Sequence, residues 1–152
     1  MTELAPLEDE LERLLLGVAG DARARLARTI ATDLRRAQAK RIRANLTPEG
    51  APMVPRKPRA GAAPKTGSLK PARMFQRAAG ARHLRTKVTP AEIAVGYAGA
   101  AARILRVHQL GLRDRVSDEA GAPEVTYPER RLIGLSADDR RRVLTKVFEH
   151  IA

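Results

Sequence analysis

The first stretch of the chain places hydrophobic residues at the spacing of a helix. They fall on one face: Leu7, Leu11, Leu14, Leu15 and Val18. Acidic residues occupy the other face and the first turn, where the helix dipole favours negative charge. Gly17 and Gly20 then interrupt the pattern. These positions predict an amphipathic helix with an acidic outer surface.

A second, longer helix is predicted from Asp21, a residue type that favours the N-cap, to about Asn45. Its hydrophobic residues form one stripe: Leu26, Ile30, Leu34, Ala37 and Ile42, filled in by Ala27 and Ala31. Basic side chains take most of the remaining surface: Arg23, Arg25, Arg28, Arg35, Arg36, Lys40, Arg41 and Arg43. The two helices are therefore expected to form a hairpin with a strongly basic outer face.

Residues 46–72 differ in composition, because proline and glycine are frequent there and hydrophobic residues nearly disappear. Proline supplies no backbone N–H, so a stretch this dense in proline and glycine holds neither a helix nor a sheet ladder. A loop of this length in a compact domain is usually functional or disordered. We expect an extended basic arm that becomes ordered mainly when a partner is present.

Regular structure is predicted to resume with a short helix at residues 72–82. Two strands follow at residues 84–88 and 92–97, joined by a turn at residues 89–91. Ile93, Val95 and Tyr97 alternate with small residues, the period of two that is typical of a half-buried strand. The two runs predict a small, mainly antiparallel sheet.

A helix that crosses this sheet is predicted for residues 100–110, and Gly111 is its stop signal. We expect Ile104, Leu105 and Val107 to face inward.

Residues 112–123 are expected to form a polar loop, and residues 125–135 an extended segment that contains a strand. Ser136 then caps a final helix, with Asp138 and Asp139 in its first turn. That helix has an apolar face: Val143, Leu144, Val147, Phe148 and Ile151. The order of elements predicts an α+β fold, organised as one domain over residues 1–152.

Composition fits one modest globular domain. The chain has 152 residues, of which 43% are hydrophobic but only 3% aromatic, so its core must be aliphatic. The N-terminus is acidic where a secretory signal would be basic, and no span approaches the roughly 20 apolar residues of a membrane helix. We expect a soluble chain made in the cytoplasm, with no membrane partner.

The net charge of +12 is concentrated in the middle of the chain. Residues 20–90 hold 18 Lys or Arg against three acidic residues, whereas residues 1–19 hold five acidic residues against one Arg. Residues 91–152 are nearly balanced. The middle segment is therefore expected to face something anionic: nucleic acid, an acidic protein surface, or the acidic N-terminal segment of another copy.

Catalytic and metal-binding patterns are weak. There is no cysteine, residues 96–99 lack the Lys-Ser/Thr pair of a phosphate loop, and His83, His108 and His150 show no metal-ligand spacing. No nucleophile is marked near His108, which favours a packing or hydrogen-bonding role. Acidic residues near the last helix could form an acid pair, but first-turn helix charges explain them better: Glu129, Asp138 and Asp139. We expect no cofactor, no metal and no enzymatic activity.

Two interpretations of the basic middle remain open. Dense Lys and Arg suit contact with a phosphate backbone, which weakens steeply with salt. The same residues also suit a solvated helix face followed by an arm. Phe75 is the only aromatic residue of this block, so sequence-specific recognition by base stacking is disfavoured.

Three blocks of the sequence carry a family resemblance: residues 45–58, residues 95–99 with 104–116, and residues 127–136. Together they resemble the phage virion morphogenesis, or tail-completion, family of Mu-like contractile-tailed bacteriophages. Residues 45–58 are similar to its N-x-x-P-x-G-x-P-x-x-P-R-K stretch. Val95-Gly-Tyr-Ala-Gly99 followed by residues 104–116 is similar to its most recognisable block, and residues 127–136 to its third. The blocks occur in the family's order, so the resemblance covers nearly the whole chain. Leu110 and Arg131 depart from the pattern and affect packing details.

The resemblance implies a structural protein that acts late in tail assembly, at the end of the tail that meets the head. It further implies a homo-oligomer, with a hexameric ring as the expected form, that contacts tail tube, sheath or neck proteins in the virion. No catalytic residue carries over. A terminator that stops tube growth and a completion factor added beside it remain equally compatible, and a small non-specific DNA-binding protein is the alternative.

Two sets of residues are candidates for function. The first is expected to contact neighbouring subunits or DNA: Arg35, Arg36, Lys40, Arg43, Arg56, Lys57, Arg59, Lys65 and Lys70. The second is expected to be a structural corner, in which His108 or Gln109 bonds the backbone of residues 125–135 after the helix stop at Gly111.

Overall fold

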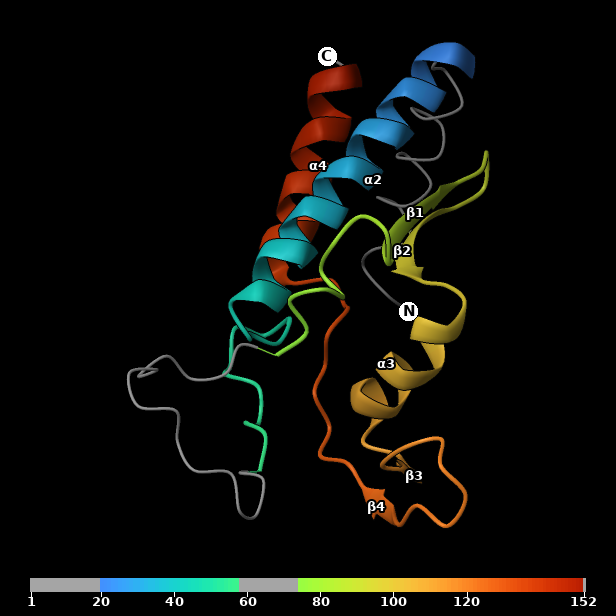
Figure 1. Cartoon of the computed structure of the whole chain (residues 1–152). Helices are drawn as coiled ribbons and strands as arrows, with labels where there is room; N and C mark the ends of the chain where they lie inside the picture. The colour runs from blue at the N-terminus through green and yellow to red at the C-terminus, as the bar shows by residue number, and fades with distance from the viewer. Residues whose placement is uncertain (1–19, 58–73, 152) are drawn as a thin grey trace, which may run out of the picture.

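The computed structural model describes residues 20–57 and 74–151 (Figure 1), so the predicted first helix lies outside the described residues. The elements follow in this order: α2 (Gly20–Arg43), β1 (Leu84–Val88), β2 (Ile93–Tyr97), α3 (Ala100–Leu110), β3 (Arg113–Arg115), β4 (Glu124–Thr126) and α4 (Ala137–Ile151). Helices and two small antiparallel sheets confirm the α+β class.

Helices α2 and α4 lie side by side and run in opposite directions (Figure 1). The ends meet at an Arg41–Asp139 ion pair of 3.0 Å, and the middles meet where Lys146 lies 3.2 Å from Asp33. An aliphatic cluster fills the space between them: Leu26, Ile30, Leu34 and Val147. The hydrophobic stripe predicted for the long helix is thus confirmed at these positions of α2.

The predicted apolar face of α4 is only partly covered. Val147 is buried, but Leu144 and Phe148 are 45% and 51% exposed. Among the described elements, α2 is the one that packs substantially against α4, and it covers one edge of that face.

The two predicted strands are present and form a β-hairpin, in which the second strand begins one residue later than expected. Strands β1 and β2 pair antiparallel, from Leu84 opposite Tyr97 to Val88 opposite Ile93. Thr89 and Glu92 exchange backbone hydrogen bonds of 2.8 and 3.3 Å across the turn. The hairpin packs against α2, which also packs against α4 (Figure 1).

A second core joins the end of α2 to the rest of the chain. It collects buried side chains from segments far apart in sequence: Ala39, Ile42, Met53, Met74, Ala79, Leu84, Leu105 and Leu132. Met53 lies within the predicted arm and Met74 follows it, so this core holds both of these segments against the rest of the fold.

Three local predictions are wrong. Residues 74–83 form consecutive turns rather than a helix, since Phe75 adopts a left-handed φ of 60° and the i→i+4 hydrogen bonds do not continue. The polar loop at 112–123 contains β3, which pairs with β4 although its Arg-Asp-Arg sequence has no apolar alternation. Ile104 is 57% exposed, because the turn of α3 directs Leu105 and Val107 into the core.

Candidate interaction surface

The basic face of α2 is real but smaller than predicted. Arg36, Lys40 and Arg43 are exposed, and Arg35 is half-buried. Arg41 does not belong to this face, because its guanidinium points between the helices and donates to Asp139 at 3.0 Å and to the Gly134 carbonyl at 2.8 Å.

Asp139 anchors the junction of α2 and α4. The residue is fully buried, and its carboxylate accepts hydrogen bonds from Arg41 at 3.0 Å and Arg142 at 2.6 Å. It also accepts from the Ser136 N–H, while the Ser136 hydroxyl accepts from the Asp139 N–H, both at 3.0 Å. This reciprocal pair is a capping box, in which Ser136 is the N-cap that the sequence predicted.

Burial by itself would raise the pKa of Asp139, but the hydrogen bonds from Ser136, Arg142 and Arg41 outweigh it and lower the pKa below its usual value. The carboxylate therefore stays charged at neutral pH, and all of its acceptor capacity serves the fold. Glu129 and Asp138 are exposed, whereas Asp139 is buried with Arg41, Arg142 and Ser136 as its partners, which favours the interpretation as first-turn helix charges.

The first part of the predicted arm is ordered on the body, which corrects the expectation for residues 46–57. Leu46 and Pro52 form an antiparallel bridge, and the Met53 N–H donates to the Asn45 carbonyl at 2.8 Å. Met53 is 5% exposed, since its side chain enters the second core. A methionine in a proline-rich stretch was the one sequence signal for this packing.

Arg130 holds this arm base, defined as residues 46–57, against α3. Its side chain donates to the Val54 carbonyl at 2.6 Å and the Pro55 carbonyl at 3.1 Å. A third nitrogen lies 3.1 Å from Nδ1 of His108, which must accept because a guanidinium only donates. The Arg130 N–H also donates to the His108 carbonyl at 2.7 Å. Sequence reasoning missed Arg130, since one arginine in an Arg-Arg pair carries no signal of burial.

Arg130 is 4% exposed, yet no carboxylate lies among its hydrogen-bond partners in the described part of the chain. Burial and, secondly, the charge of Arg56 lower its pKa from the usual value. The same causes act on His108, where burial comes first and the charges of Arg130 and Arg56 follow, so its pKa is lowered too. His108 is therefore neutral at physiological pH.

The side chains of the predicted corner meet the segment that follows β4. The Gln109 amide accepts from the N–H groups of Leu132 and Ile133, at 2.7 and 3.1 Å, and donates to the Ile133 carbonyl at 2.9 Å. The His108 ring lies edge-on to Phe75 and Tyr127, each with a centroid distance of 5.0 Å.

Gly111 ends α3 in the left-handed conformation, with φ of 63°. A Cβ there would lie 3.0 Å from the Glu129 nitrogen, so both the backbone angle and the close approach require glycine.

The predicted contact residues thus fall into separate places. The α2 residues share one helix, whereas Arg56 and Lys57 are exposed at the end of the arm base. Arg59, Lys65 and Lys70 lie outside the described residues.

A metal site requires clustered ligands, and a membrane span requires a long apolar helix. Residues 20–57 and 74–151 contain no cluster of three or more His, Asp or Glu side chains that could hold a metal ion. Within the same ranges, no helix is long and apolar enough to cross a membrane.

Comparison with known proteins gives one consistent result. The model of the phage virion morphogenesis family matches residues 2–152. The chain is 29% identical to tail completion protein S of Escherichia phage P2 over 152 residues, which covers 99% of each protein. No solved structure matches significantly.

Proposed function

Because the chain belongs to the phage virion morphogenesis family, we propose that it is a structural protein that completes or terminates a phage tail. The observation that carries the proposal is the end-to-end similarity to a protein named for tail completion. The described structure supports a binding rather than a catalytic role, since its buried polar groups hold the fold together.

The protein acts at the head-proximal end of the tail and enables head–tail joining as a subunit of a hexameric ring. A ring subunit needs a rigid body and segments that reach its neighbours. The two cores supply the first, and the residues that follow Lys57 in the sequence are proposed to supply the second. Its partners are further copies of itself and tail tube, sheath or neck proteins.

The basic surface is proposed to contact an acidic neighbouring protein or DNA in the channel. Exposed ion pairs contribute only about 0–1 kcal/mol each, so such an interface needs many of them or added apolar contact. The exposed Leu144 and Phe148 of α4 are available for the latter.

Electron microscopy of lysates from a phage that lacks this gene tests the role. Separate full heads and unjoined tails support tail-end action, and tails of abnormal length favour a terminator over a completion factor. Intact infectious particles contradict the proposal.

Complementation then tests the arm. Charge reversal at Arg56, Lys57 and Arg59 is expected to block head–tail joining while the protein stays folded, because the exposed pair of this set carries no part of the core. The matched control reverses three exposed arginines elsewhere: Arg77, Arg106 and Arg140. Normal particle yield from the arm variant, or equal loss from the control, contradicts a specific role for the arm.

A small non-specific DNA-binding protein is the second candidate, favoured by the net charge of +12 and the exposed basic residues of α2. It predicts binding by the isolated chain to any duplex, with an affinity that falls steeply as salt rises. Such binding in a phage whose tails join normally without the gene would promote this candidate.

A further inference from the structure

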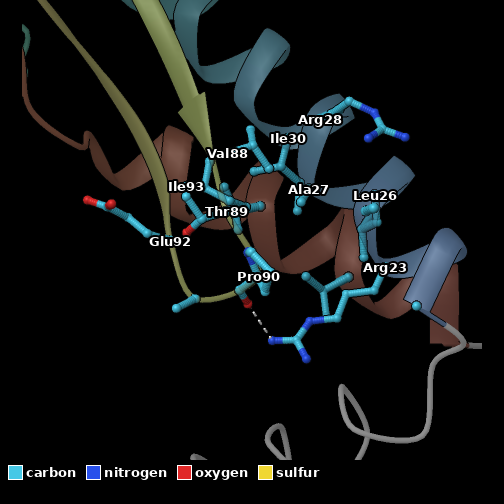
Figure 2. A pocket seen from close by; sticks show the side chains of 15 residues that line it. Arg23, Leu26, Ala27, Arg28, Ile30, Val88, Thr89, Pro90, Glu92 and Ile93 are labelled. Carbon is cyan, nitrogen blue, oxygen red and sulfur yellow. Dashed lines mark hydrogen bonds between the residues drawn. The ribbon is translucent and has the colours of Figure 1, made fainter.

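A groove of about 640 Å³ lies between the first half of α2, the β1–β2 turn and α4. Figure 2 shows it from close by, with the guanidinium of Arg23 donating to the Pro90 carbonyl at 3.0 Å. Its lining is mainly aliphatic: Leu26, Ala27, Ile30, Val88, Ile93 and Val147.

The groove does not have the character of a small-molecule site. Such sites combine an apolar lining with a few convergent polar groups that fix the ligand. Here the Arg23 side chain is engaged by backbone, and Glu92 points away from the groove in Figure 2. An aliphatic occupant with its own polar side fits better, which is the character of an amphipathic helix.

The position of Gly20 identifies a candidate occupant. Gly20 lines the groove and is joined directly to residues 1–19, which lie outside the described residues. That segment has five aliphatic residues at helical spacing, and Gly17 and Gly20 provide backbone freedom for a reversal of the chain.

Charge complementarity points to the same occupant. Residues 1–19 carry five acidic residues against one arginine, whereas the α2 stretch beside the groove carries three arginines against Asp21. When the aliphatic face of the segment enters the groove, its acidic face lies near Arg23 and Arg28, both of which border the groove.

We propose that the apolar face of residues 1–19 docks in this groove of the same chain, as a helix antiparallel to α2. Docking covers the aliphatic lining and places an acidic stripe beside the start of the basic helix. The inference concerns the isolated chain and does not depend on the proposed role in tail assembly.

Cross-linking tests the docking directly, because the natural chain has no cysteine. Leu14→Cys is combined with Ala27→Cys, which lines the groove, or with Arg25→Cys, which is exposed on the opposite face of α2. A short linker gives an effective concentration on the order of millimolar, so the groove pair is expected to close within one chain at any protein concentration. We expect a monomeric disulfide several-fold more abundant for the groove pair than for the control pair.

Three outcomes overturn the proposal. Equal cross-linking of both pairs means that the segment has no preferred site, and absence of cross-linking means that it does not reach the groove. Disulfide dimers that grow with protein concentration assign the groove to a second copy.

A thermal measurement supplies an independent readout. Leu11→Asp combined with Leu14→Asp is expected to lower the melting temperature, whereas Glu10→Ala on the polar face is expected to change it little. An unchanged melting temperature in the double variant contradicts docking.

Discussion

Two arginines with little exposure to solvent hold two regions of the molecule in different ways. Arg41, at the junction of α2 and α4, meets the buried carboxylate of Asp139 at 3.0 Å. Arg130, at the arm base, is held by two backbone carbonyls and the neutral ring of His108. The first positive charge is neutralised by a partner, whereas the second is only solvated by dipoles.

This difference predicts that the two regions respond differently to pH. The lowered pKa of Asp139 keeps the helix junction charged and paired at every pH above the ordinary range of a carboxylic acid. We expect the arm base to be most stable while His108 is neutral, because among the described residues no carboxylate is a hydrogen-bond partner of Arg130. We therefore expect the arm base to be more sensitive to mild acid than the junction of α2 and α4.

The largest effect is expected at the paired charge. Asp139→Ala leaves Arg41 without its carboxylate partner and removes part of the cap of α4, and breaking such a pair costs about 3–5 kcal/mol of unfolding free energy. Urea denaturation measures it. The control Asp138→Ala removes an exposed carboxylate of the same helical turn and is expected to change stability by less than about 0.5 kcal/mol. Similar values for both variants would contradict an anchoring role for Asp139.

Acid titration sharpens this test. Because the folded pKa of Asp139 is below its unfolded value of 3.8, its contribution is present above that pH and is lost as pH falls through the folded pKa. The pH dependence below about 4 should therefore flatten in the Asp139→Ala variant.

Arg130→Leu is expected to cause a smaller loss of unfolding free energy than Asp139→Ala. The change leaves the Val54 and Pro55 carbonyls without their donor, which costs about 2–3 kcal/mol in total. Compared with the natural protein, the variant should show faster hydrogen exchange in residues 46–57, with little change in α2. Arg131→Leu is the matched control, since Arg131 forms only an exposed ion pair with Glu49. Unchanged exchange in the arm base would show that other contacts hold it.

His108→Ala is expected to cost about 1–2 kcal/mol at pH 8, mainly through its lost aromatic contacts. Its lowered pKa adds a pH signature. As pH falls below 6.5 the unfolded chain protonates first, so the natural protein loses stability down to the folded pKa, whereas the variant lacks this loss. Melting temperatures between pH 8 and 5 measure it. Parallel pH profiles for the two proteins would contradict the proposed sensitivity of the arm base.

The smallest effect on folding is expected at the surface of α2. Arg36→Glu with Lys40→Glu replaces exposed side chains and should change unfolding free energy by about 0.5 kcal/mol or less. The same variant should weaken any binding to duplex DNA or to an acidic neck protein, measured by titration at several salt concentrations. Unchanged binding would remove this face from the candidate surface.

The sequence by itself determined the elements that have strong local signals. Helix α3 and its Gly111 stop, the hairpin and the Ser136 cap follow from periodicity and from residue types whose backbone preferences are local. The α+β class follows from their order. The family was also visible in the sequence, because its blocks lie in order along the chain.

The tertiary structure alone decided which polar residues are buried or largely shielded from solvent. Arg41, Arg130 and Asp139 have the same local sequence signals as their exposed neighbours Arg43, Arg131 and Asp138. The partner that removes each from water lies far away in sequence: Arg41 is 98 residues from Asp139, and Arg130 is 76 residues from Val54.

The same reason explains the arm base and the short strand β3. Pro/Gly-rich composition correctly excluded regular structure at residues 46–57, but long-range hydrogen bonds and the burial of Met53 order them nonetheless. Strand β3 forms because β4 supplies its ladder partners, not because its own residues favour a strand. Local propensity is a property of neighbouring residues in sequence, whereas burial and pairing depend on what the folded chain brings alongside.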